Sequence, residues 1–205
     1  MRIALIALLL GACHAKFKKH APIIQRAHVE VTTLGPPQVV LGQADGDGIG
    51  SLAVNAMQAI RGGELAKKIA RAVDTEEMDA RFSEAFVEAL GDGPPFAASL
   101  KGKGSLVSVE VVSWGMGVPE IGLQGTFHYS LAVRIYMPDG KRVYTNREAC
   151  AIPVGDPDAF SQVLGIVDNA KAVDDMSRRA IREAFYETAA GCAAVVVSQM
   201  RKHGG

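Results

Sequence analysis

Residues 127–152 read FHYSLAVRIYMPDGKRVYTNREACAI and hold the clearest structural pattern in the chain. Apolar residues from Phe127 to Met137 alternate with more polar ones, which is the period of a strand that buries one of its faces. A Pro-Asp-Gly turn follows at 138–140, where proline presets φ and glycine tolerates a left-handed conformation. The pattern predicts a long β-hairpin over about 126–152.

Helical patterns lie on both sides of this hairpin. Asp74 and Glu77 have the spacing of a capping box, and the apolar residues that follow repeat at helical intervals up to Gly91. An earlier helix, starting near Ser51, is expected to break at Gly62-Gly63. A last helix is expected to open at Asp174 or Asp175 and to continue close to the C-terminus.

Short strands are predicted at 28–32, 38–41 and 106–114. The order of elements is therefore short strands, helices, three consecutive strands and helices again. This order is typical of an α+β fold. We expect an antiparallel sheet with a long hairpin, covered on one face by helices that include a long C-terminal helix.

The composition excludes several classes of protein. The chain has 205 residues, and 22 Lys and Arg balance 22 Asp and Glu, whereas a nucleic-acid-binding protein would need a basic stripe. Charged residues make up 21% and hydrophobic residues 48%, which argues against intrinsic disorder. The length is that of a single domain with its own core.

The first thirteen residues have the pattern of an export signal. Arg2 precedes an apolar run over 3–10, which is far shorter than a bilayer-spanning helix, and small residues follow it. The end of this segment, Leu10-Gly11-Ala12-Cys13, resembles the lipobox of bacterial lipoproteins. The resemblance implies that Cys13 becomes the first mature residue and carries a diacylglycerol. An ordinary cleaved signal or an uncleaved anchor is the alternative.

The lipobox resemblance implies how the chain is divided into segments and where in the cell the protein is located. It implies a signal peptide over 1–12, a lipidated N-terminus with a flexible basic tether over 13–27, and one periplasmic α+β domain over 28–205. Residue 14 is His rather than the Asp that marks inner-membrane retention in enterobacteria, which favours the outer membrane, facing the periplasm. The tether holds three lysines that could contact anionic headgroups.

Cys150 and Cys192 are the cysteines that remain after lipidation. An oxidising compartment favours a disulfide between them, and two buried free thiols are the alternative. If Met137 pairs with Lys141, Cys150 faces His128 on the side of the hairpin away from the apolar row. That register separates the two sulfurs and places Cys150 beside His128, although a bulge would reverse both conclusions.

The segment between the predicted strands, SWGMGVPEIGL at 113–123, mixes glycines with large apolar residues. One hypothesis is a mobile docking loop for a protein or an acyl group, since exposed tryptophan and methionine are favoured at contact sites. The other is that these side chains fold back and cap the end of the sheet. The residues concerned are Trp114, Met116, Val118, Pro119, Ile121 and Leu123.

No pattern in the sequence indicates metal or cofactor chemistry. The histidines and cysteines lack the spacing of metal ligands, and neither a phosphate-binding loop nor a nucleophile elbow is present. We therefore expect no metal, no cofactor and no nucleic-acid partner.

These features favour a lipid-anchored bacterial envelope protein without enzymatic activity, acting as an accessory or scaffold subunit of a periplasmic or outer-membrane complex. Its expected partners are the membrane, reached through the N-terminal lipid, and an envelope protein. One alternative is a carrier of a lipid or small apolar ligand, with the Trp114 segment as a lid over a cavity between helices and sheet. A second is an envelope hydrolase that uses His128 or Cys150.

Overall fold

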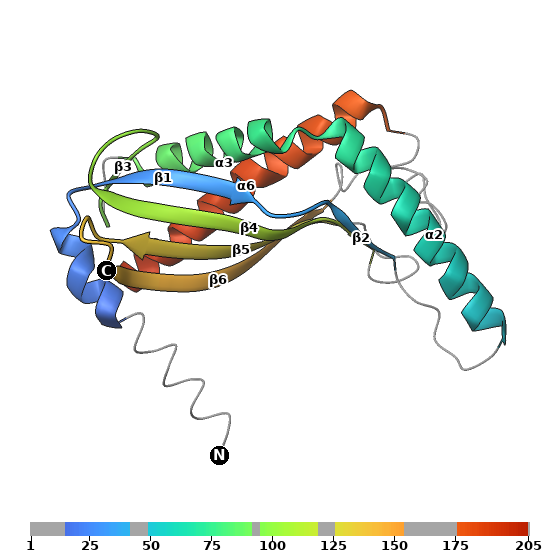
Figure 1. Ribbon diagram of the computed structural model, residues 1–205, viewed down its shortest axis with the longest axis horizontal. Coiled ribbons are helices and arrows are strands. Elements are labelled where there is room, and N and C mark those ends of the chain that lie inside the picture. The colour runs from blue at the N-terminus through green and yellow to red at the C-terminus, as the bar shows by residue number, and fades with distance from the viewer. Residues whose placement is uncertain (1–14, 42–48, 92–94, 119–125, 154–175, 205) are drawn as a thin grey trace, which may run out of the picture.

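A computed structural model describes residues 15–41, 49–91, 95–118, 126–153 and 176–204. One six-stranded sheet is formed by β1 (Arg26–Thr33), β2 (Gln38–Leu41), β3 (Ala97–Ser99), β4 (Ser105–Val118), β5 (Thr126–Tyr136) and β6 (Arg142–Pro153). The longer helices are α2 (Ile49–Ala72), α3 (Thr75–Leu90) and α6 (Arg178–Gly204), with a short 3-10 helix, η1 (Ala21–Ile23), before β1. Figure 1 shows α3 and α6 side by side against one face of the sheet, whereas α2 points away from it.

The sheet is mixed, so the expectation of an antiparallel sheet is correct only for one half. The strand order is β3-β1-β4-β5-β6, with β2 also paired to β4. β1 runs parallel to both β3 and β4, and β2 runs parallel to β4, while β4, β5 and β6 are antiparallel. The reason is the connection: α2 and α3 lie between β1 and β4, and a helical crossover returns the chain in the same direction. The α+β class itself is as predicted.

The hairpin forms where the sequence predicts it, with one change of register. Met137 donates its backbone N–H to the carbonyl oxygen of Lys141 at 2.9 Å, and Gly140 has φ +80°. Tyr136 pairs with Arg142, but the next pair joins Ile135 to Tyr144, because an extra residue bulges out of β6. The bulge shifts every later pair by one residue, so the predicted register is wrong beyond the turn.

One helix starts where the sequence predicts it, whereas another starts later and a predicted helix break is absent. Asp74 caps α3, since its Oδ1 accepts from the backbone N–H of Glu76 at 2.9 Å. α2 continues through Gly62-Gly63, so the predicted break is wrong; glycine weakens a helix by about 1 kcal/mol without ending it. α6 begins at Arg178 with Ser177 as its cap, later than predicted. None of the described helices is both long and apolar enough to cross a bilayer.

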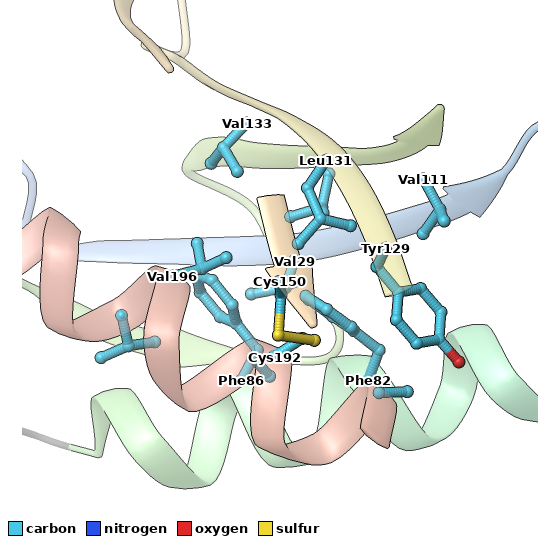
Figure 2. Packing of buried hydrophobic residues seen from close by; sticks show 14 of the residues in the cluster. Val29, Phe82, Phe86, Val111, Tyr129, Leu131, Val133, Cys150, Cys192 and Val196 are labelled. Carbon is cyan, nitrogen blue, oxygen red and sulfur yellow. A yellow bond between two sulfur atoms is a disulfide. The ribbon is translucent and has the colours of Figure 1, made fainter. Parts of the chain in front are cut away.

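The core lies between the sheet and the α3–α6 pair. Figure 2 shows the layer that the inward side chains of the sheet form against Phe82 and Phe86 of α3 and Cys192 and Val196 of α6. The sheet residues labelled there are Val29, Val111, Tyr129, Leu131, Val133 and Cys150. Burial of this layer removes large apolar side chains from water and is the main stabilising contribution to the domain.

β2 lies close to β4 at Gly115, which pairs with Gln38. Gly115 has φ +149°, and a Cβ placed there would lie 1.8 Å from the carbonyl oxygen of Gln38. We expect Gly115→Ala to lower the free energy of unfolding by about 2–3 kcal/mol in urea denaturation. Gly117→Ala is the control, because its Cβ would meet Thr126 and His128 only at 3.7 and 3.8 Å. Equal midpoints for the two variants would contradict this account.

Candidate functional site

The residues proposed as a docking loop are not a loop where the structure describes them. Trp114 and Met116 lie in β4 and are fully buried, so the docking hypothesis is wrong for both. The Trp114 indole N–H donates to the carbonyl oxygen of Gly35 at 3.1 Å. Val118 is the last residue of β4, and Pro119, Ile121 and Leu123 lie outside the described residues.

Cys150 and Cys192 are joined by a disulfide between β6 and α6 (Figure 2). The bulge explains how they meet: Cys150 pairs with Tyr129 rather than with His128, and it therefore faces the helices. The register that separated the two sulfurs is wrong for this reason. The bulge also separates Cys150 from His128, which lies on the opposite face of the sheet, and Cys150 holds no free thiol.

The face of the sheet away from α3 and α6 carries many of the polar side chains of β1, β4 and β5. Here Arg134 of β5 forms an ion pair with Glu110 of β4, with Nη1 and Oε1 2.5 Å apart. On β1, His28 lies near Glu30, with 3.5 Å between Nε2 and Oε1. We call this surface the open face. It provides mixed charges and hydrogen-bonding groups, as a solvated sheet face does.

His128 lies on the open face, half-buried opposite Gly115. Burial lowers the pKa of its imidazole below the ordinary value, because the charged form loses solvation. His128 is consequently neutral at pH 7. Among the described residues no hydrogen bond orients His128 toward a nucleophile, and no group of three metal-ligating side chains includes it.

The lowered pKa of His128 makes stability depend on pH. The unfolded chain takes up a proton near pH 6.5, before the folded chain does, so stability falls as the pH drops below that value. We expect His128→Gln to show a shallower fall between pH 7 and pH 5 than the native chain. Denaturation midpoints measured at several pH values test this, and parallel curves for the two chains would contradict it.

The segment expected to be a flexible tether is part of the fold from residue 15 onward. Residues 15–20 are helical, and Phe17 is fully buried with its ring centroid 4.5 Å from that of Tyr144. The Tyr144 hydroxyl in turn shares a hydrogen bond of 2.9 Å with Nδ1 of His203, near the end of α6. The prediction of a flexible tether is therefore wrong for residues 15–27. Sequence reasoning missed Phe17, whose only signal is a single aromatic ring in a basic segment.

The space between sheet and helices is filled by aromatic rings in the part of the chain described. Phe185 of α6 packs edge-on against Trp114, with 5.4 Å between the ring centroids, and its ring is tilted against that of Phe127 at 4.4 Å. The Tyr129 hydroxyl donates to the carbonyl oxygen of Phe185 at 2.9 Å. The cavity and tryptophan lid expected of a carrier are therefore not what these residues form.

Two hollows lie on the outer surface of the described residues. One, between α2 and the start of α6, is mostly basic and includes Lys67, Arg71 and Arg178. The other, between α3 and α6, is mostly acidic and includes Glu84, Glu88, Glu183 and Glu187. Both are open to solvent and lined by charged side chains, unlike the enclosed, mostly apolar pockets that bind small molecules.

No family model and no curated protein matches this chain. Among solved structures, it is similar to protein XCC0632 of Xanthomonas campestris, of the DUF330 family, with 11% identity over 88% of this chain and 86% of that one and a TM-score of 0.46. It is also similar to the hypothetical protein CT253 of Chlamydia trachomatis, with 13% identity over 83% and 98% of the two chains and a TM-score of 0.33. At these scores neither structure identifies a family or a function for this chain.

Proposed function

We propose that this protein is anchored to a bacterial envelope membrane through lipid on Cys13, with its domain facing the periplasm, and that it acts as a non-enzymatic accessory or scaffold subunit. The lipobox-like sequence Leu10-Gly11-Ala12-Cys13 carries the proposal, and the burial of Phe17 limits how far the domain could lie from the lipid. Phe17 is four residues from Cys13, and four residues of extended chain reach at most about 14 Å. Lipid on Cys13 would therefore hold the domain against the membrane surface.

The disulfide gives independent support for export. Disulfides persist in oxidising compartments such as the periplasm and are rare in the cytosol of most organisms. The Cys150–Cys192 bond joins the edge strand β6 to α6, across 42 residues of sequence. A bond in this position suits a domain that matures outside the cytoplasm.

The positions of Cys150, Tyr129 and His128 support a non-enzymatic role. Cys150 is in the disulfide, and Tyr129 has its hydroxyl hydrogen-bonded in the core, where burial raises its pKa. His128 lies on the far side of the sheet from both. Cys150 and Tyr129 therefore have structural roles. The three residues do not come together as the group of catalytic side chains that a hydrolase would need.

Labelling with a radioactive fatty acid tests the anchor. We expect the native chain to take up label and to remain with the membrane fraction, and Cys13→Ala to lose essentially all of the label. Cys192→Ala is the matched control, since it also removes one cysteine but leaves the lipobox unchanged. Equal label in the native chain and in Cys13→Ala would contradict the lipid anchor.

The scaffold role is tested by photo-crosslinking in cells. A photoreactive residue at Thr32 or Ala149 probes the open face, and one at Glu84 or Arg182 probes the helix layer; all four positions are exposed. We expect one adduct of defined mass from one of the two faces and none from the other. A chain that gives no adduct from either face, and leaves detergent-solubilised membranes as a monomer, would contradict the scaffold role.

A further inference from the structure

The end of the domain that holds residue 15, two residues after Cys13, is strongly basic. The helix over 15–20 exposes Lys16, Lys18 and Lys19, and Arg26 is exposed at the start of β1. Lys16 donates from Nζ to the backbone carbonyl oxygen of Arg142 at 2.6 Å, which ties this helix to the turn between β5 and β6. The lysines of the N-terminal segment are therefore held in place on the domain.

Three other segments lie at the same end of the molecule (Figure 1). They are the loop before β4, the β5–β6 turn and the end of α6, which add the exposed residues Lys101, Lys103, Lys141, Arg142, Arg201 and Lys202. Contacts join these segments directly. A Cβ on Gly104 would lie 2.7 Å from the carbonyl oxygen of Arg26, and Ser105 donates to the sulfur of Met137 at 3.9 Å.

Basic residues are more frequent at this end of the domain than in the chain as a whole. These ten residues are nearly half of the 22 Lys and Arg of a chain whose formal net charge is zero. Within the described parts of the same segments the acidic side chain is Asp139, whose carboxylate already accepts from the backbone N–H of Lys141. We call this set of ten residues the basic end.

Apolar side chains accompany the charges. Ile23 is 62% exposed in η1, and Leu100 is 47% exposed beside Lys101. Basic residues mixed with exposed apolar ones are typical of surfaces that rest in the headgroup region of a bilayer. Exposed aliphatic side chains contribute less to a nucleic-acid site, because the affinity of such a site comes from contacts to phosphates and base edges.

We propose that the basic end lies on the anionic phospholipid headgroups of the membrane and thereby fixes the orientation of the domain. α2, at the opposite extreme of the molecule, then points away from the bilayer (Figure 1). The inference rests on the proposed function only in placing a membrane beside the domain. Lysine and arginine near an anionic surface each raise the affinity by about fivefold, so ten residues are ample for stable contact.

Vesicle flotation tests this contact without the anchor. The protein is the chain from residue 13 onward with Cys13→Ser, which keeps every residue of the described fold and carries no lipid. We expect it to bind phosphatidylethanolamine vesicles that contain 30% phosphatidylglycerol and to leave vesicles of phosphatidylcholine unbound. Raising the salt to 1 M should release it, because the screening length falls to about 3 Å.

Two variants with the same change of net charge separate a local surface from a general attraction. In the first, Lys101, Lys103, Lys141 and Lys202 are changed to glutamate, and we expect the affinity for anionic vesicles to fall by at least about a hundredfold. In the control, Lys67, Arg71, Arg178 and Arg182 are changed to glutamate, and we expect a change of less than about fivefold. The four lysines changed to glutamine serve in place of the first variant if circular dichroism shows that it is unfolded.

Three outcomes would overturn the proposal. They are equal loss of binding in the two glutamate variants, binding to anionic and neutral vesicles alike, and retention on heparin without binding to anionic vesicles, which would indicate a soluble polyanion as the ligand. The chain used for flotation has no lipid, so the two proposals can fail separately. If it does not bind anionic vesicles but the native Cys13 takes up fatty acid, the orientation is refuted and the lipid anchor stands. If it binds anionic vesicles but the native Cys13 takes up no fatty acid, the anchor is refuted and the membrane contact of the basic end stands.

Discussion

Replacing both Cys150 and Cys192 with alanine is expected to lower the free energy of unfolding by about 4 kcal/mol. The bond closes a loop across a sequence separation of 42 residues, and cross-linking a loop of this length removes entropy from the unfolded chain worth about that amount. Both residues are buried in the core, so the loss of side-chain packing adds to the effect. Urea denaturation of the Cys13→Ser chain measures it.

The same experiment contains its own control. Reducing agent should destabilise the chain that has both cysteines and leave the double alanine variant unchanged. A difference below about 1 kcal/mol between the oxidised and reduced chains would contradict a stabilising bond between β6 and α6, since native disulfides in small exported domains contribute about 2–5 kcal/mol.

Phe185→Ala is expected to lower the free energy of unfolding by about 4 kcal/mol, because it empties the centre of the aromatic cluster. The ring of Phe185 is fully buried and contacts the rings of Trp114, Phe127 and Tyr129. Aromatic pairs at these distances contribute beyond the area that they bury. The cavity would lie between two layers of regular structure, which limits how far the surroundings can collapse into it.

Val195→Ala on the same helix is the matched control for Phe185. Val195 is 41% exposed, so its truncation should cost less than about 1 kcal/mol. Phe185→Leu should fall between the two, since it keeps most of the volume and loses the ring contacts. Similar urea midpoints for Phe185→Ala and Val195→Ala would show that the cluster does not support the fold in the way described.

Local chemistry was enough to predict the elements that depend on neighbouring residues. The alternation over 127–137 produced β5, and the Pro-Asp-Gly turn produced the reversal that leads into β6. Asp74 capped α3 at the predicted position, because an N-cap needs only a side-chain oxygen and the N–H groups two and three residues later. Such signals are complete within a few residues of sequence.

The candidate site depended on a single residue that local chemistry does not specify. One extra residue in β6 moved Cys150 from the open face to the core and so decided whether it met His128 or Cys192. The alternation of β6 is weak, since polar residues lie on both of its faces, and a weak alternation does not set a register. Packing of α6 against the sheet favours the bulged arrangement, and that packing is a long-range property.

Trp114 and Phe17 are two further residues whose burial depends on partners that are distant in sequence. Glycine neighbours made the Trp114 segment resemble a loop, yet Phe185 and Gly35, both distant in sequence, provide the contacts that bury it. Lysine neighbours made the Phe17 segment resemble a tether, yet Tyr144 provides a surface on which its ring packs. In each case the partner is more than 70 residues away, and no pattern within the segment could indicate it.

The sequence by itself determined the α+β order of elements, the hairpin and its turn, the start of α3 and the signal-like first thirteen residues, because period, turn chemistry and capping act over short distances. Only the tertiary structure decided the parallel half of the sheet, the partner of Cys150, the burial of Trp114 and Phe17, and the gathering of ten basic residues at one end. Those features arise where segments far apart in sequence meet, and the free energy that selects them comes from burial and packing across the whole core.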